Sequence, residues 1–332
     1  MGFDLKFSII TASLGNLGDR FLPSGYKKLV SLEEKLRNIS RIREITGIEL
    51  CYGPEGEESE AGKVMDLLNT FDLRASVVNA PLSSSKEWKL GTFSAVDAKT
   101  RQDAIDVTKK TIDFAEGVGA EMVNLWQGQD GFDYCFQTDY SRQWEYMIEG
   151  VRECADYNPN IRICLEFKPR EPRNRALLNT AATTLLMIQE IDRDNVGVTV
   201  DNGHVLQHGE NMAQVAALCD RYGKLFNLHL NDNYAAWDDD MIVGSVHLVE
   251  YLELLYVLRK INYDGWCSID IFPFREDAFR ATEESVKFVL GYSNWVERVG
   301  FEYLTDLVRN GSVTDILKLI RTTLFTNSAC AE

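Results

Sequence analysis

The sequence of 332 residues has few histidines, no closely spaced cysteines and no long apolar run. Its seven cysteines are scattered without a Cys-x-x-Cys pair, which argues against a disulfide framework or a clustered structural zinc site and predicts reduced, mostly buried thiols. No apolar segment approaches the roughly 20 residues of a membrane span, and the first residues lack the basic start and cleavage site of a signal peptide. We therefore expect a soluble, cytoplasmic protein.

Positive charge is also scarce, because 35 Lys and Arg residues face 51 Asp and Glu residues, giving a formal net charge of −16. Such a charge argues against a nonspecific grip on nucleic acid or on anionic lipid. The prediction is therefore no nucleic-acid partner and no membrane partner. The hydrophobic share of 45% is enough to bury one sizeable core and excludes disorder by composition.

Eight short apolar segments recur along the chain, and each is followed by a longer segment with helical spacing. The predicted strands span residues 5–12, 47–52, 73–79, 121–126, 161–167, 196–201, 225–230 and 266–272. The first predicted helix carries an apolar stripe of Leu29, Leu32, Leu36, Ile39 and Ile42. The other predicted helices span residues 61–69, 95–117, 140–156, 181–191, 211–222, 244–261 and 278–291.

This alternation predicts the α/β class and a closed (β/α)8 TIM barrel over residues 1–292. Residues 293–332 continue with a helical pattern and no further strand. We expect them to form a C-terminal helical tail that packs on the barrel or on a neighbouring subunit, and we expect a homo-oligomer.

Acidic and imidazole side chains gather at the ends of the last four predicted strands, where a barrel places its chemistry. They are Glu166, Asp201, His229 and Asp270. Oxygen and imidazole ligands favour Mn²⁺, Mg²⁺ or Co²⁺ in octahedral geometry over a sulfur-rich zinc site. Without a cation, such groups in a dry barrel mouth repel one another at a cost of several kcal/mol. The sequence therefore predicts one divalent metal site rather than four separately satisfied polar residues.

A run of three aspartates follows the seventh predicted strand at residues 238–240. Residues i and i+2 of an extended loop point the same way, so Asp238 and Asp240 can both reach a second ion. His204 completes the predicted ligand set, and Asp201 bridges the two ions. A solvated acidic loop is the alternative interpretation.

Other strand ends offer candidates for binding a substrate. Lys168 lies two residues past Glu166, and either it hydrogen-bonds a substrate oxygen or it compensates the acidic cluster from the surface. Trp126 either forms an apolar wall for a sugar or closes the barrel rim. Glu49 either binds a hydroxyl group or caps a loop, and Asn79 ends the third predicted strand.

Three segments resemble a known family. Leu-Glu-Phe-Lys-Pro-Arg-Glu-Pro at 165–172 resembles the fifth-strand signature of the xylose isomerase-like barrels. Val-Asp-Asn-Gly-His with Gly-Glu-Asn at 200–211 is most similar to the L-rhamnose isomerase branch. So is His-Leu-Asn-Asp with Trp-Asp-Asp-Asp and Val-Gly-Ser at 229–245. The resemblance is specific over about residues 119–277 and generic elsewhere.

The resemblance implies a metal-dependent aldose–ketose isomerase. The lack of a phosphate-binding motif predicts an unphosphorylated monosaccharide as its substrate. One ion would chelate adjacent substrate oxygens, and the other would polarise the carbonyl while a hydride moves between C1 and C2. The ligands of the structural ion would be Glu166, Asp201, His229 and Asp270, and those of the catalytic ion Asp201, His204, Asp238 and Asp240. The predicted catalytic residues are Lys168, Glu166 and Asp240, and the predicted substrate-binding residues are Trp126, Glu49 and His204.

Two features depart from the family pattern. All four histidines lie between residues 204 and 247, so ring opening needs another group such as Glu49, or a substrate in its open form. Related ketose 3-epimerases generally carry a Glu acid/base on the eighth strand, where this chain has Asp270. Its shorter reach favours metal ligation and therefore an isomerase. His208 and His247 fall in helical segments and are predicted to be structural or solvent-facing.

Three other functions are weighed against the isomerase. A ketose 3-epimerase would use the same barrel with one ion, and a non-catalytic sugar-binding barrel would not need every ligand type found here. A phosphodiesterase of the endonuclease IV type would use more histidines and a basic surface. No glycine-rich loop followed by Lys marks a phosphate site. The sugar is selected by the early loops at 15–25 and 83–92, which carry no motif.

Overall fold

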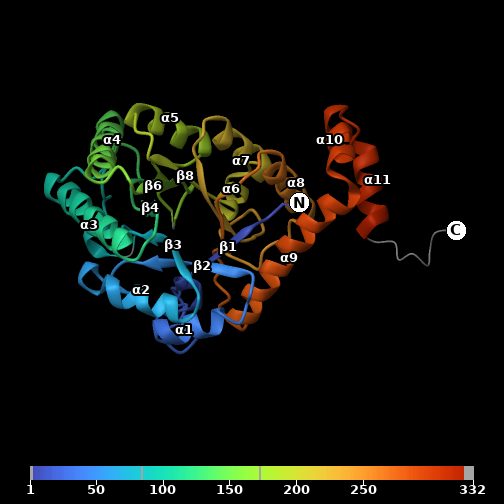
Figure 1. Cartoon of the computed structure of the whole chain (residues 1–332). Coiled ribbons are helices and arrows are strands. Elements are labelled where there is room, and N and C mark those ends of the chain that lie inside the picture. The colour runs from blue at the N-terminus through green and yellow to red at the C-terminus, as the bar shows by residue number, and fades with distance from the viewer. Residues whose placement is uncertain (1–2, 84, 172, 325–332) are drawn as a thin grey trace.

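Eight parallel strands close into a barrel in the computed structural model, which describes residues 3–83, 85–171 and 173–324 (Figure 1). The strand order around the barrel is β1-β10-β9-β8-β6-β4-β3-β2. Their bounds are β1 Lys6–Ile10, β2 Ile45–Cys51, β3 Arg74–Asn79, β4 Met122–Trp126, β6 Arg162–Glu166, β8 Val196–Asp201, β9 Leu225–Leu230 and β10 Trp266–Ile269. The TIM barrel predicted from the eight apolar segments is confirmed.

Helices surround the barrel and follow its strands (Figure 1). They are α1 Leu32–Ile39, α2 Ala61–Thr70, α3 Ala98–Gly117, α4 Tyr140–Tyr157, α5 Ala181–Ile191, α6 Asn202–His208, α7 Met212–Arg221, α8 Leu248–Lys260, α9 Ala278–Val299, α10 Phe301–Arg309 and α11 Val313–Leu324. Short 3₁₀ helices are η1 Thr11–Leu14, η2 Glu58–Glu60 and η3 Lys86–Trp88. The sequence did not predict α6 or the antiparallel pair β5 (Gly131–Phe132) and β7 (Arg175–Ala176).

Side-chain caps and apolar faces set the limits of these helices. The Asp97 carboxylate accepts the backbone N–H of Thr100 at 2.9 Å and so begins α3. On α1, Leu36 and Ile39 have no exposed surface and face the barrel. Leu29 is 79% exposed and precedes the helix, so it does not belong to the predicted apolar stripe.

Two aromatic rings fill the amino-terminal half of the barrel interior. Trp266 begins β10 and Phe226 is the second residue of β9. Room for these rings comes from Gly47 on β2 and Gly197 on β8. A Cβ at Gly47 would lie 2.6 Å from the Trp266 ring, and a Cβ at Gly197 would lie 2.4 Å from the Phe226 ring. The polar residues of the barrel interior therefore lie on the carboxyl-terminal side of an aromatic layer formed by Trp266 and Phe226.

The C-terminal helices extend from the barrel as a separate lobe (Figure 1). Helix α9 runs past residue 292 without interruption and ends at Gly300, which has φ of +93°. The boundary predicted at 292 therefore falls inside this helix. The lobe is fastened by Trp295, whose Nε1 donates to Thr323 Oγ1 at 2.8 Å, and by a contact of Phe301 with a tyrosine of α8.

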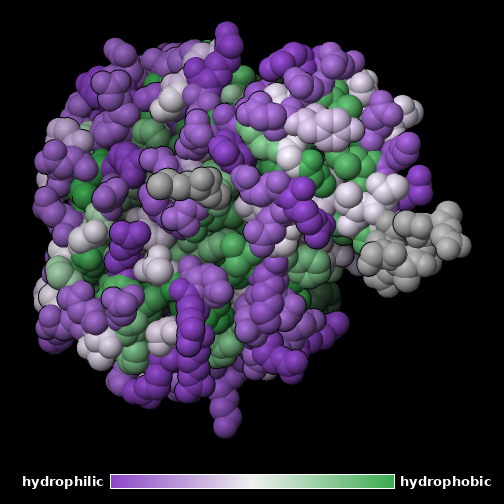
Figure 2. All heavy atoms as spheres, turned by 45° about the vertical axis from the view of Figure 1, so that its right-hand side comes forward, coloured by the Kyte–Doolittle hydropathy of each residue, from purple (hydrophilic) through white to green (hydrophobic). Residues whose placement is uncertain are grey.

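The face of the molecule drawn in Figure 2 is largely hydrophilic, and hydrophobic side chains lie on the lobe of α10 and α11. The exposed apolar side chains there are Tyr303, Val308, Val313 and Leu317. Within the described ranges, none of the helices is long and apolar enough to cross a membrane.

Candidate metal centre

Four adjacent strands bring the predicted ligands of the first ion together. Glu166 is the last residue of β6, Asp201 is the last residue of β8, His229 lies on β9, and Asp270 directly follows β10. Because these strands are neighbours in the barrel, their carboxyl ends place the four side chains around one point. One ligand atom from each residue lies within 4.8 Å of the others. We call these residues the first ligand group.

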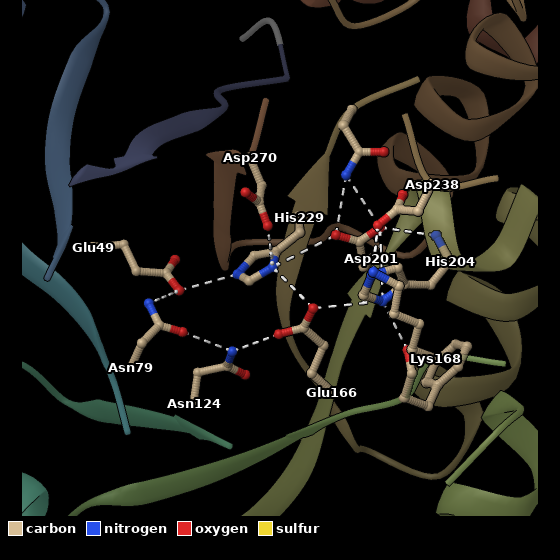
Figure 3. A network of polar contacts seen from close by, with 12 residues as sticks. Glu49, Asn79, Asn124, Glu166, Lys168, Asp201, His204, His229, Asp238 and Asp270 are labelled. Atoms are coloured by element: carbon tan, nitrogen blue, oxygen red, sulfur yellow. Dashed lines mark hydrogen bonds and ion pairs between the residues drawn. The ribbon is translucent and has the colours of Figure 1, made fainter. Parts of the chain in front are cut away.

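The centre of the first ligand group is the Nδ1 atom of His229 (Figure 3). It lies 3.2 Å from Asp270 Oδ2, 3.6 Å from Glu166 Oε1 and 3.7 Å from Asp201 Oδ2. This Nδ1 is buried and makes no hydrogen bond with any residue that the structure describes. Buried polar atoms are almost always paired, so an unpartnered nitrogen facing three carboxylates points to a missing cation. The donor set fits a divalent ion that prefers oxygen and imidazole, such as Mn²⁺, Mg²⁺ or Co²⁺.

The protonation of these groups reflects their crowding. Burial, together with the like charge of Asp238, raises the pKa of Asp201 to about 7. Burial acts the same way on Glu166, but the facing ring of His229 outweighs it and lowers the pKa of Glu166 to about 2. Burial disfavours the charged ring of His229, yet the carboxylates of Glu49 and Glu166 hold its pKa well above the usual value. Protons therefore partly occupy the place where a divalent ion would balance the charge.

Helix α6 begins directly after Asp201 and places His204 in its first turn. Asp201 is the N-cap of α6, and its Oδ1 accepts the backbone N–H of His204 at 2.9 Å. The first helical turn thereby puts the His204 ring beside Asp201. A Cβ at Gly203 would lie 2.1 Å from Asn231 Oδ1 and 2.5 Å from Asp238 Oδ1, so only glycine leaves room for these two side chains.

A second ligand group shares Asp201 with the first. Asp201, His204 and Asp238 offer ligand atoms within 4.8 Å of one another. His204 Nε2 lies 3.1 Å from Asp238 Oδ2, while its Nδ1 lies 2.8 Å from the carbonyl oxygen of Phe167. Asp240, the fourth predicted ligand, is not among the atoms that meet this limit. Asp201 belongs to both ligand groups, which is the position predicted for a ligand that bridges two ions.

Lys168 is buried between the second ligand group and the barrel rim. Its Nζ donates to Asp238 Oδ2 at 2.7 Å and to Glu171, and it lies 5.0 Å from the centre of the Trp126 ring. Burial disfavours the ammonium, but Asp238 outweighs it and raises the pKa of Lys168 well above the usual range. Lys168 is therefore a buried cation rather than a surface lysine.

Glu49 and Asn79 lie behind His229, on the side away from the first ligand group (Figure 3). Glu49 has no exposed surface, and its Oε1 accepts from His229 Nε2 at 3.0 Å and from Asn79 Nδ2 at 2.9 Å. Asn124 Nδ2 donates to Asn79 Oδ1 at 2.9 Å and to Glu166 Oε2 at 2.6 Å. Asn124 was not predicted from the sequence. Its place two residues before the strand-ending tryptophan was the available signal, because residues i and i+2 share a face.

Backbone and side-chain hydrogen bonds hold the loop after β9 closed. Asp232 and Met241 exchange backbone hydrogen bonds at 2.8 and 3.1 Å. The Asp232 carboxylate also accepts from the backbone N–H groups of Val246 and His247 and contacts His247 Nδ1 at 2.7 Å. His247 thus has a structural role, one of the two alternatives that the sequence left open, and it fixes the loop that carries Asp238.

A cavity of about 380 Å³ adjoins Asp240 at the barrel mouth. Its aromatic lining residues are Tyr26, Phe272 and Phe274, and its charged ones are Asp19, Asp239, Asp240, Glu276 and Arg275, so carboxylates outnumber the cation. A polar, uncharged molecule with apolar faces suits such a lining better than an anion does.

A closed parallel barrel with acidic and imidazole side chains at its carboxyl-terminal mouth defines a class of barrels suited to divalent metals. Comparison with known families narrows this class. The model of the xylose isomerase-like TIM barrel family matches residues 39–291, so the chain belongs to that family. Membership in the L-rhamnose isomerase branch stays a prediction.

Individual proteins show the same relationship. The xylose isomerase of Thermus thermophilus is 26% identical over 230 residues, which is 68% of this chain and 59% of that protein. The chain therefore matches less than two thirds of that relative. The crystal structure of a D-tagatose 3-epimerase-like protein is 22% identical with a TM-score of 0.69, covering 89% of this chain and 100% of that chain. D-Psicose 3-epimerase from Clostridium cellulolyticum H10 is 16% identical with a TM-score of 0.66, covering 88% and 99%. These two structures share the fold.

Proposed function

We propose that the protein is a divalent-metal-dependent aldose–ketose isomerase that acts on an unphosphorylated monosaccharide. The observation that carries this proposal is the pair of ligand groups that share Asp201, with one orphaned imidazole nitrogen at the centre of the first group. The curated xylose isomerase relative supports the reaction class. The acidic lining of the cavity beside Asp240 favours a substrate without phosphate.

The two ligand groups would hold two ions: Glu166, Asp201, His229 and Asp270 the first, and Asp201, His204 and Asp238, with Asp240 as a candidate, the second. Bound there, the ions would orient adjacent substrate oxygens and polarise the carbonyl group. Lys168 keeps its proton because Asp238 faces its ammonium, so it is a fixed donor for the carbonyl oxygen on which negative charge develops. The Trp126 ring lies 5.0 Å from the ammonium and would form one wall of the space that holds this carbonyl oxygen.

The chain supports hydride transfer better than proton abstraction. Glu166, Asp201 and Asp270 all face the Nδ1 atom of His229, so as ligands none of these three carboxylates would be free to remove a carbon-bound proton. In the direction from aldose to ketose, the hydrogen on C2 moves with its electron pair to C1. The C2 hydroxyl loses its proton to become the carbonyl, and O1 takes up a proton to become a hydroxyl.

A ketose 3-epimerase is the second candidate. Glu166 and Asp270 both lie within 3.6 Å of His229 Nδ1, and two carboxylates at one centre can also pass a proton from one face of a carbon to the other. D-Psicose 3-epimerase and L-ribulose 3-epimerase are among the solved structures with this fold.

Product analysis in deuterated water separates the two reactions. The metal-free protein would be loaded with Mn²⁺, Co²⁺ or Mg²⁺ and given a panel of free aldoses and ketoses. The isomerase predicts interconversion of an aldose and a ketose with little solvent deuterium at C1 or C2. Stoichiometric deuterium at C3 would establish the epimerase, and deuterium at C1 or C2 would establish an enediol route. A panel with no turnover under any metal would refute both.

A further inference from the structure

Glu49 occupies an unusual place for a charged side chain. It lies on β2, on the opposite side of the His229 ring from the first ligand group, and it has no exposed surface. A sugar in the barrel mouth does not reach a carboxylate in this position. The predicted role in binding substrate or opening a sugar ring therefore does not fit, and another role must account for a buried charge.

The hydrogen bond between Glu49 and His229 selects a tautomer. A carboxylate only accepts hydrogen bonds, so at 3.0 Å from Glu49 Oε1 the Nε2 atom of His229 must carry a proton. In the neutral ring this leaves the lone pair on Nδ1. That atom is the one that faces Glu166, Asp201 and Asp270 at 3.2 to 3.7 Å. Glu49 thus turns the unprotonated nitrogen toward the place of the ion.

A second branch of the network orients another ligand. Asn79 donates to the same Oε1 of Glu49, and its own Oδ1 accepts from Asn124, which also donates to Glu166 Oε2 (Figure 3). Glu166 then keeps Oε1 for the first ligand group. One chain of hydrogen bonds from β2 through β3 and β4 therefore holds both His229 and Glu166.

We propose that Glu49 is a positioning residue for the metal centre, which fixes the Nε2-protonated tautomer of His229 and, through Asn79 and Asn124, the orientation of Glu166. This inference rests on the proposed function for the presence of an ion in the first ligand group. Partners that orient a metal-ligating histidine raise its basicity and restrict its rotation. Their loss typically lowers metal affinity about 10- to 100-fold.

Metal binding without any sugar tests the proposal. Mn²⁺ titrations of the metal-free protein, followed by calorimetry, would compare the wild type with Glu49→Gln and Glu49→Ala. We expect Glu49→Ala to weaken the tighter site about 100-fold. We expect Glu49→Gln to weaken it by about 10-fold or less, because its amide oxygen still accepts from His229 but carries no charge. The weaker site should change little in either variant.

Glu55→Gln is the matched control. Glu55 lies four residues beyond Cys51, the last residue of β2, its side chain is 5% exposed, and it pairs with Lys35 at 2.8 Å, with no hydrogen bond to any ligand. Its neutralisation should lower the melting temperature without changing Mn²⁺ affinity. A loss of affinity in Glu55→Gln equal to that in Glu49→Ala would show general destabilisation and overturn the proposal.

The tautomer itself is measurable, because the chain has only four histidines. In ¹⁵N-histidine-labelled protein loaded with Mg²⁺, NMR should show His229 protonated at Nε2 in the wild type and in Glu49→Gln. At a Mg²⁺ concentration that saturates the wild type, Glu49→Ala, or Asn79→Ala if Glu49→Ala does not fold, should show a fraction of unloaded chains in which His229 is not held in this tautomer.

Failure of this inference and of the proposed function give different results. A wild-type protein that binds no divalent ion refutes the function and removes the basis of the inference. A wild type that binds Mn²⁺ tightly, with Glu49→Ala binding as tightly or with His229 protonated at Nδ1, refutes the role of Glu49 alone.

Discussion

The pair of Lys168 and Asp238 makes the second ligand group testable by one substitution, Asp238→Asn. The two side chains are 7% and 4% exposed, and Asp238 Oδ2 takes both the Lys168 ammonium and His204 Nε2. Removing one partner of a buried ion pair costs about 3–5 kcal/mol. Because Glu171 also pairs with Lys168 and is 35% exposed, we expect the lower end, about 3 kcal/mol. At roughly 2 °C per kcal/mol for a chain of this size, the melting temperature should fall by about 6 °C.

The same substitution should remove one ion. Equilibrium dialysis against Mn²⁺ should give two ions per chain for the wild type and one for Asp238→Asn. Asp239→Asn is the control, because among the described residues the Asp239 carboxylate accepts only a long hydrogen bond, from Tyr234 N at 3.5 Å. It should match the wild type in both measurements. If Asp238→Asn keeps its melting temperature and both ions, the assignment of the second ligand group is wrong.

Three further predictions concern the rest of the molecule. Asp240→Asn should lower kcat while keeping the tighter ion, and since Asn tolerates the φ of +46° at this position, an unchanged melting temperature would separate chemistry from folding. Gly47→Ala should lower the free energy of unfolding by about 1–3 kcal/mol in denaturant titrations, because its Cβ would clash with the Trp266 ring. An unchanged free energy of unfolding would show that the Trp266 ring can shift. The backbone N–H of Thr100 lowers the pKa of Asp97, so its cap stabilises α3 above about pH 4 and is lost as pH falls through the lowered value. The melting temperature of Asp97→Ala should therefore approach that of the wild type at about pH 2, and a constant difference would contradict this.

The first ligand group could be predicted from sequence because it depends on strand ends alone. Glu166 and Asp201 end their strands, and His229 and Asp270 lie within one residue of strand ends. Parallel strands of a barrel bring such positions together whatever the loops do. The sequence therefore needed only the location of each strand, which its apolar residues marked.

Loop geometry limited the prediction for Asp240. The prediction assumed an extended loop in which residues i and i+2 point the same way. Asp240 instead has a φ of +46°, a left-handed conformation that breaks this alternation. Single-residue backbone reversals of this kind leave no periodic signal in a sequence.

The role of Glu49 could not be predicted for a different reason. Its partner His229 is 180 residues away, and the contact depends on which nitrogen of the ring faces which side of the barrel. Glu49 was predicted to end the second strand but lies two residues before Cys51, where β2 ends. Strand position alone also does not distinguish a side chain that faces the substrate from one that lies behind a ligand.

The unequal use of the two halves of the barrel has a consequence for how such proteins diversify. Every member of both ligand groups comes from the consecutive segment between β6 and the residue after β10, whereas the first loop contributes Asp19 and Tyr26 to the wall of the cavity. Changes in the N-terminal loops can therefore alter which molecule is accepted without disturbing either ligand group. Joining different N-terminal halves to one constant C-terminal half would be a practical route to new substrate ranges, provided that each N-terminal half keeps Glu49, Asn79 and Asn124.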